Sequence, residues 1–290
     1  MSKILRLTHP LHLLLAALTF TLGAGIARYL GTVVKWLPFW FGLLAVLALQ
    51  AAASLLVEYF RLSFLPLAPD ETPRLRGLFR TRLLQAAYAA LTLSGAAIVS
   101  LLLLGGLDLA AGILLALAVA LLMAYAVPPA RLSETGYGEL IQAVVFTTFL
   151  PAIAFLLQAG EFHRLLPLTA FPLTLLAVAW LLASNFSAFA ADQKQGRRSL
   201  LVRLTWQRAV PIHHVLILTA FLLFTGAPFF GVSWGLVWPV FLALPFAALQ
   251  IYWLQRIASG GRPVWKFFDL LALSVYGLTV YLLALSFWLR

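Results

Sequence analysis

Long apolar runs, interrupted by proline, glycine or charged residues, are the main feature of this chain. Nine runs have about the 20 residues that a helix needs to cross a bilayer. They cover residues 11–30, 37–57, 84–104, 107–127, 139–158, 165–184, 210–227, 232–254 and 267–289. The runs do not alternate apolar and polar positions, and they are too long for barrel strands of about 10 residues. The pattern predicts an all-α polytopic membrane protein, with nine transmembrane helices in a single domain over residues 1–290.

The composition agrees with this prediction and excludes a soluble enzyme. Of the 290 residues, 63% are hydrophobic and 10% are charged, whereas soluble domains are roughly 45–50% apolar and about 25% charged. The absence of cysteine excludes disulfides, thiolate catalysis and cysteine-ligated metal sites. The first run follows Lys3 and Arg6, as the apolar part of a signal peptide would. It has the length of a full span, however, and no soluble domain follows it, which favours a transmembrane helix.

The basic residues predict the orientation of the chain. With a cytoplasmic amino terminus, 16 of the 20 lysines and arginines fall on the cytoplasmic side and four on the other. The positive-inside rule then places the amino terminus inside and the carboxyl terminus outside the cytoplasmic membrane. Two basic cytoplasmic loops, residues 61–83 and 192–209, hold five basic residues each. Because the charges lie in short loops and not on one polar face, the net charge of +11 does not indicate nucleic-acid binding.

Three segments carry a resemblance to a known family. Residues 184–204 read SNFSAFAADQKQGRRSLLVRL, residues 135–160 read TGYGELIQAVVFTTFLPAIAFLLQAG, and residues 49–60 read LQAAASLLVEYF. The first segment is similar to the second aspartate-rich motif of the UbiA superfamily of intramembrane prenyltransferases. It is closest to the branch that prenylates 1,4-dihydroxy-2-naphthoate in menaquinone synthesis, with Asn185, Asp192, Gly196, Arg197 and Arg198 in register. The second segment looks like the family's Gly-x-Gly-Glu segment, and the third stands where the family has Asn-x-x-Asn-Asp-Tyr. The resemblance implies a nine-helix bundle whose cavity opens to the cytoplasm and laterally to lipid.

The departures from the two motifs bear on activity. As the resemblance implies, the family ionises an allylic diphosphate with Mg²⁺, and two ions would draw on about four carboxylates. Here only Glu58 and Asp192 keep an acidic group, while motif aspartates fall on Arg61 and Ala188. Arg61 lies one turn from Glu58 on the same helical face. It would repel a cation by about 4 kcal/mol at ~4 Å and an effective dielectric constant of about 20.

These departures argue against the family's dimagnesium centre. Glu58, Asp192 and Asn185 are the candidate remnant of the acidic site. If the protein is active and binds Mg²⁺, the expected metal ligands are Glu58 and Asp192. Apart from Mg²⁺ and the pigment or haem considered below, the sequence indicates no cofactor.

The arginines and lysines offer a second kind of site. Five residues of the two basic loops are candidates for binding a diphosphate or an anionic head group, since arginine binds phosphate oxygens in a bidentate manner. They are Arg74, Arg76, Lys194, Arg197 and Arg198. The alternative is that these charges only set the topology and attract anionic lipid.

Three functions remain open from the sequence. The first is a catalytically degenerate homologue that binds a quinone or isoprenoid-type lipid, or serves as a subunit of a membrane protein complex. The second is an active, divergent prenyltransferase that moves a prenyl group from a prenyl diphosphate to an aromatic acceptor. The third is a pigment- or haem-associated subunit, with His213 or His214 as the ligand. Adjacent helical histidines point about 100° apart and do not form one chelate, so an interfacial polar pair is the alternative for these two residues.

Overall fold

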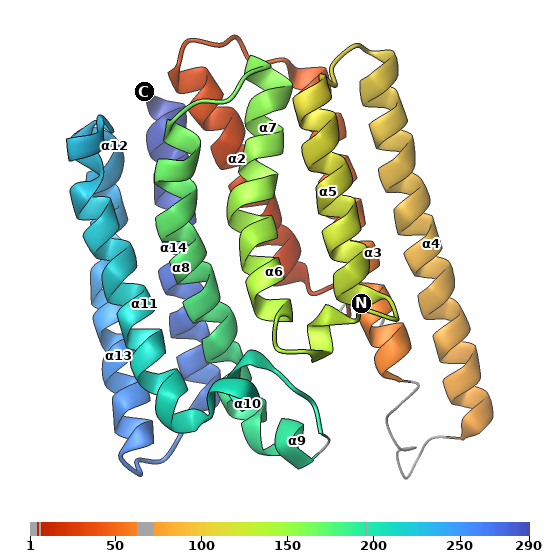
Figure 1. Ribbon diagram of the computed structural model, residues 1–290, viewed down its shortest axis with the longest axis vertical. Coiled ribbons are helices and arrows are strands. Elements are labelled where there is room, and N and C mark those ends of the chain that lie inside the picture. Colours follow the sequence, from red (N-terminus) through yellow and green to blue (C-terminus); the bar gives the residue numbers. More distant parts are fainter. Residues whose placement is uncertain (1–4, 6, 63–71, 195) are drawn as a thin grey trace.

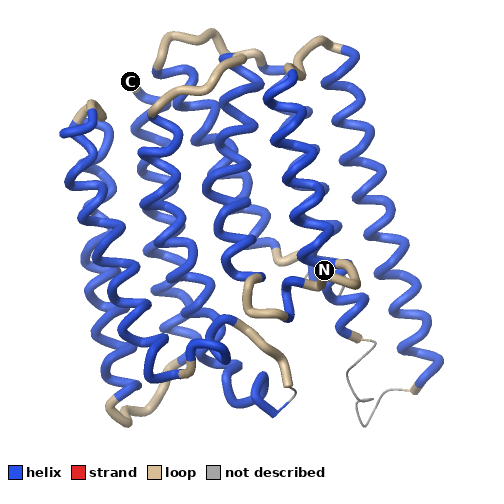
Figure 2. Tube along the Cα trace, viewed as in Figure 1, coloured by secondary structure: helices blue, strands red, loops and turns tan. Residues whose placement is uncertain are grey.

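Upright helices packed side by side make up the computed structural model, which describes residues 5, 7–62, 72–194 and 196–290 (Figure 1). Within these residues nine helical segments are long and apolar enough to cross a membrane, and the predicted all-α fold is confirmed. They are Pro10–Tyr29, Trp36–Arg61, Pro73–Leu103, Leu109–Ala126, Gly138–Ala159, Leu165–Lys194, Trp206–Phe230, Trp234–Ala258 and Trp265–Leu289. The described part of the chain contains no strand (Figure 2). The chain is an integral membrane protein.

Five of the spans are single helices and four are composite. The single helices are α2 (Pro10–Tyr29), α3 (Trp36–Arg61), α4 (Pro73–Leu103), α5 (Leu109–Ala126) and α14 (Trp265–Leu289). The fifth span consists of α6 (Gly138–Val144), the π-helical turn η2 (Val145–Phe149) and α7 (Leu150–Ala159). The sixth consists of α8 (Leu165–Asn185), η3 (Phe186–Ala188) and α9 (Phe189–Lys194). The seventh joins α11 (Trp206–Gly226) to η4 (Ala227–Phe230), and the eighth joins α12 (Trp234–Val237), η5 (Trp238–Ala243) and α13 (Leu244–Ala258). Two short helices, η1 (Leu132–Glu134) and α10 (Leu200–Leu204), lie between spans.

Local capping explains where α4 and α5 begin. The Thr72 hydroxyl accepts a hydrogen bond from the Leu75 amide at 3.3 Å, and Pro73 occupies the first turn, where its missing N–H costs nothing. The Asp108 carboxylate accepts one from the Ala111 amide at 2.8 Å. Residues 73–83 are therefore helical, which corrects the prediction of one loop over residues 61–83. Residues 63–71 of that segment lie outside the described residues. The second predicted loop, 192–209, likewise contains α10 and the first turn of α11.

Burial ranks the helices from the centre of the bundle outwards. In the apolar segments of the α6–α7 and α8–α9 spans 72% of the residues are buried, against 22% for α4, which stands at the edge of the bundle (Figure 1). The centre is close-packed. At Gly23 of α2 a β-carbon would overlap the Pro151 backbone of α7, so only glycine permits this approach of the two helices.

The end of the bundle that carries α9 and α10 holds the ionisable residues Glu58, Arg61, Glu139 and Arg197. α2 begins towards this end and α14 finishes at the opposite end (Figure 1). The start of α6 and the ends of α3, α5 and α8 also lie on the side of α9 and α10. These helix ends, together with the segment between α9 and α10, enclose the cavity described next.

Candidate functional site

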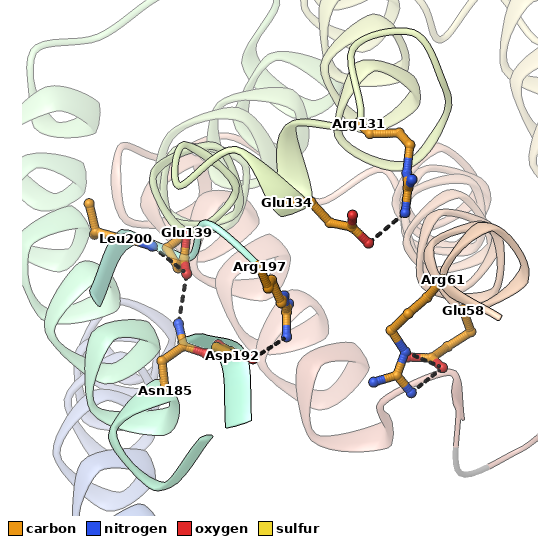
Figure 3. Close-up of polar contacts among 9 residues, drawn as sticks. All are labelled: Glu58, Arg61, Arg131, Glu134, Glu139, Asn185, Asp192, Arg197 and Leu200. Atoms are coloured by element: carbon orange, nitrogen blue, oxygen red, sulfur yellow. Dashed lines mark hydrogen bonds and ion pairs between the residues drawn. The ribbon is translucent and has the colours of Figure 1, made fainter. Parts of the chain in front are cut away.

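A cavity of about 320 Å³ opens among the ends of α3, α5 and α8 and the starts of α2 and α6. Unusually for the interior of a membrane protein, its wall carries ionisable groups from several helices. Glu58 and Arg61 come from α3, Glu139 from α6, and Arg197 from the segment between α9 and α10. Figure 3 shows these side chains with their partners and with the nearby ion pair of Arg131 and Glu134.

Glu58 is paired with Arg61 inside this cavity. Both the Nε and an Nη of Arg61 donate to Glu58 Oε2, at 3.1 and 2.7 Å. The side chain of Glu58 is 10% exposed and that of Arg61 is 42% exposed, so the guanidinium reaches from the protein surface to a nearly buried carboxylate. The pair lies within one turn of α3, as its i,i+3 spacing allows. The guanidinium therefore occupies one of the two carboxylate oxygens of Glu58 that a cation would bind.

Glu139 joins three parts of the chain around the cavity. Its Oε1 accepts hydrogen bonds from Asn185 Nδ2 at 2.7 Å and from the Leu200 amide at 3.2 Å. These bonds connect the start of α6 to the end of α8 and to the start of α10 (Figure 3). Its Oε2 is buried and has no hydrogen-bond partner among the described residues. The two hydrogen-bond donors on Oε1 stabilise the Glu139 carboxylate in this position.

Two glycines shape the backbone that leads into Glu139. Gly136 has a left-handed backbone, with φ of +80°, and the Arg203 side chain fills the space that a β-carbon would take. A β-carbon at Gly138 would meet the Ser133 backbone. The Arg203 guanidinium lies over the Tyr137 ring at 4.6 Å, which holds α10 against the start of α6.

Asp192 is held by a second arginine. An Nη of Arg197 lies 3.6 Å from Asp192 Oδ1, and the Arg197 amide donates to the Asp192 carbonyl at 2.9 Å. Asp192 is 4% exposed, and its Oδ2 has no hydrogen-bond partner within the described ranges. Arg197 lines the cavity while Asp192 does not. The guanidinium thus stands between this carboxylate and the cavity.

The structure brings together only part of the site suggested by the sequence. Glu58, Asn185 and Arg197 line one cavity, with Asp192 beside it. The other basic candidates do not line it: Arg74, Lys194 and Arg198 are exposed, and Arg76 is half-buried on α4.

Several cavity residues were not site candidates from the sequence. Glu139 was available as the acid of the Gly136-Tyr137-Gly138-Glu139 segment, within a run read as a membrane span. His9, His12, Tyr125 and Gln142 also line the cavity, and their spacing in the sequence carried no signal for it.

These residues do not fit a two-metal diphosphate site. Magnesium prefers carboxylate, water and phosphate oxygens in octahedral geometry. Among the described residues no group of three or more histidine, aspartate or glutamate side chains is placed to hold a metal ion. One oxygen of each cavity carboxylate is already bound: Glu58 Oε2 by Arg61, and Glu139 Oε1 by Asn185 and Leu200. The three carboxylates Glu58, Glu139 and Asp192 and the two guanidiniums Arg61 and Arg197 also leave no net positive charge to attract a diphosphate.

His213 is engaged within the bundle. It is fully buried, and its Nε2 lies 2.8 Å from Gln250 Nε2, on α13. The rings of His213 and His214 are 5.6 Å apart and inclined at 70°, so they do not face one ligand. The contact with Gln250 engages Nε2 of His213, whereas Nδ1 of His213 and Nε2 of His214 have no hydrogen-bond partner among the described residues.

Comparison with known proteins gives the family and the fold. The model of the UbiA prenyltransferase family matches residues 71–275. Among solved structures, a UbiA homologue from Archaeoglobus fulgidus bound to Cd²⁺ has a TM-score of 0.63 at 15% identity, covering 97% of this chain and 99% of that one. The A. fulgidus homologue bound to DMAPP and Mg²⁺ gives 0.59 at 16%, with the same coverage. A digeranylgeranylglyceryl phosphate synthase gives 0.61 at 12%, covering both chains completely. No curated protein matches the chain. The match to the family model extends over more than half of the chain, which therefore belongs to the UbiA prenyltransferase family.

Proposed function

We propose that this protein is a UbiA-family lipid-binding protein that no longer ionises a prenyl diphosphate with magnesium. The observation that carries the proposal is the Arg61 guanidinium on Glu58. In the first motif, the position that would supply a second carboxylate supplies a cation, and that cation is bound to the remaining acid. A metal ion at Glu58 would have to displace two charge-assisted hydrogen bonds, which are about twice as strong as neutral ones.

The second motif supports the same conclusion. Asp192 is its only carboxylate, because Ala188 stands at the other acidic position. Arg197 lies between Asp192 and the cavity. A homologue of the same fold is described with DMAPP and Mg²⁺ bound, whereas here the acids of both motifs are paired with arginines. The proposed ligand is a lipid of the quinone or isoprenoid kind, held without a metal.

Three finer assignments belong to the same proposal. The resemblance of residues 184–204 favours descent from the branch that prenylates 1,4-dihydroxy-2-naphthoate. The distribution of basic residues favours a cytoplasmic cavity end, an inside amino terminus and an outside carboxyl terminus. A degenerate homologue would act by presenting or storing its lipid, or as a subunit of a larger membrane complex.

A turnover assay tests the loss of catalysis. Purified protein in lipid nanodiscs would be incubated with Mg²⁺, geranyl diphosphate and 1,4-dihydroxy-2-naphthoate, and the products separated by chromatography. We expect no prenylated product, while an active UbiA homologue in the same discs gives one. Turnover that disappears in Asp192→Ala would overturn the proposal.

An active, divergent prenyltransferase is the second candidate, and one observation favours it. Glu139 Oε2 and Asp192 Oδ2 are buried without hydrogen-bond partners in the described part of the chain, and such oxygens are able to bind a single cation. In that case binding of a prenyl diphosphate would require Mg²⁺ and weaken in Glu139→Gln. Binding of an uncharged isoprenoid that is independent of Mg²⁺ would favour the lipid-binding protein instead. An absorption spectrum of the purified protein tests the pigment hypothesis, which requires a visible band.

A further inference from the structure

Four basic residues without acidic partners lie where the last three membrane spans begin or end. No aspartate or glutamate occurs between Asp192 and Asp269, although this stretch holds eight lysines and arginines. The basic corner consists of four of them: Arg208 in the first turn of α11, Arg256 in the last turn of α13, Arg262 in the connection to α14, and Lys266 in the first turn of α14. All four are exposed, and none forms an ion pair with a described residue.

Aromatic contacts hold the three helix ends together. The rings of Trp206 on α11 and Trp265 on α14 are 6.2 Å apart, and the ring of Trp253 on α13 is 5.4 Å from that of Phe267 on α14. The Arg256 guanidinium lies over Trp253 at 5.0 Å, which fixes its position. Figure 1 shows these helix ends on the side of the bundle that carries α9 and α10. The four cations therefore belong to one part of the molecular surface.

The backbone brings Arg262 next to α13. The Gly261 amide donates to the Arg256 carbonyl at 2.9 Å, and a β-carbon at Gly261 would overlap the Arg256 backbone. The connection to α14 is thus folded tightly onto the last turn of α13. Arginines at positions 256 and 262 stand side by side at this turn, where two guanidiniums are able to bind the oxygens of one phosphate group.

The starts of α11 and α14 add positive potential to the same corner. The amino-terminal end of a helix carries a partial positive charge, and acidic residues are favoured there. Neither helix has an acidic residue in its first turn or a side chain that caps it. They carry Arg208 and Lys266 in these turns instead. An anion beside the basic corner would offset both the side-chain charges and the helix dipoles.

The surroundings favour a phospholipid over a soluble anion. Trp206, Trp253 and Trp265 stand at the ends of membrane spans, where indoles favour the membrane–water interface. The basic corner therefore lies at the depth of lipid head groups. Next to it, α11 and α13 present exposed apolar side chains for acyl chains to cover, namely Val215, Leu249 and Tyr252.

We propose that the basic corner binds the head group of an anionic glycerophospholipid, with Arg256 and Arg262 as the main contacts to its phosphate and the acyl chains against α11 and α13. Arg208, Arg256 and Arg262 do not line the cavity of the candidate site. The inference is therefore independent of the proposed function. General attraction to an anionic bilayer would act on every exposed arginine alike, whereas this site requires the basic corner in particular.

Native mass spectrometry of the full chain in a non-ionic detergent tests the proposal. Phosphatidylglycerol and phosphatidylcholine with identical acyl chains would be titrated into delipidated protein, and the dissociation constant of the first bound lipid measured for each. We expect phosphatidylglycerol to bind at least about fivefold more tightly, the factor that one cation near an anionic head group provides. Glycerophosphoglycerol, which is the same head group without acyl chains, should not displace the lipid at equal concentration. Displacement would indicate a site for a soluble anion and would overturn the proposal.

Variants locate the site within the protein. Arg256→Gln and Arg262→Gln should each weaken binding of phosphatidylglycerol about fivefold and leave phosphatidylcholine unchanged, while Arg256→Lys, which keeps the charge, should lose less. The matched control is Arg82→Gln, an exposed arginine of α4 at the opposite edge of the bundle, which should keep the wild-type preference. If Arg256→Gln does not fold, Arg262→Gln and the wild-type lipid pair decide. Equal affinity for the two lipids, or an equal loss in Arg82→Gln, contradicts the inference.

Discussion

Replacing Arg61 with aspartate should turn the ion pair of the first motif into a cation site. The substitution removes two hydrogen bonds to Glu58 and places two carboxylates within one turn of α3. Two such charges about 6 Å apart repel by roughly 3 kcal/mol at an effective dielectric constant of about 20. Since the Arg61 side chain is 42% exposed, solvent screens part of both effects. We expect Arg61→Asp to lose about 2–3 kcal/mol of stability when metal is chelated.

Magnesium should restore much of this loss in Arg61→Asp and have little effect on the wild type. A site filled at about 100 times its dissociation constant stabilises the folded protein by about 2.7 kcal/mol. The assay is thermal unfolding in nanodiscs, in EDTA and in MgCl₂. Arg61→Met is the matched control, because it removes the guanidinium without adding a carboxylate and should be destabilised in both buffers alike. If the wild type gains as much stability from Mg²⁺ as Arg61→Asp does, Arg61 does not stand in the place of a cation, and the argument for lost catalysis fails.

Three further predictions concern packing, the hydrogen bonds of Glu139 and pH. Gly23→Ala should lower the free energy of unfolding by about 1–3 kcal/mol, because its β-carbon would overlap the Pro151 backbone. The control is Gly95→Ala, where a β-carbon meets nothing, and this variant should be neutral in the same thermal unfolding assay. Glu139→Ala should cost about 1–3 kcal/mol by leaving the Asn185 amide and the Leu200 N–H without their acceptor, whereas Glu139→Gln, which keeps an acceptor oxygen, should cost clearly less. Desolvation lowers the pKa of His9 below its ordinary value near 6.5, a shift that the Glu58 charge opposes and the Arg61 charge reinforces. As the pH decreases, the unfolded chain therefore binds the proton before the folded chain does, and the free energy of unfolding should fall through about pH 6.5. The fall should be smaller in His9→Gln.

The bundle could be predicted from the sequence because bilayer thickness sets the length of an apolar run. Each of the nine predicted runs corresponds to a helical span. The prediction failed where a helix continues into charged residues. Hydropathy places the start of the third span at residue 84, yet α4 begins at Pro73, since arginine is a good helix former and Thr72 caps the first turn. The Thr72-Pro73 pair was the available signal for that start.

Some contacts of the candidate site join residues that are close in the sequence, and others join residues that are far apart. Arg61 on Glu58 could be expected from the sequence, because residues three apart on a helix are neighbours whatever the tertiary fold. The bonds of Glu139 to Asn185 and Leu200 span 46 and 61 residues, and they depend on how α6 packs against α8 and α10.

The local origin of both ion pairs bears on the proposed loss of the metal site. Arg61 and Glu58 share a turn of α3, and Arg197 is held five residues from Asp192 by a backbone hydrogen bond. Each ion pair therefore forms independently of the other. The carboxylates of the two motifs are neutralised by their own arginines, without an ion shared between them. Restoring a carboxylate at position 61 leaves Arg197 on Asp192, and removing Arg197 leaves Arg61 on Glu58. If the proposed function holds, a single substitution creates at most half of a metal centre, and magnesium-dependent chemistry requires changes in both motifs.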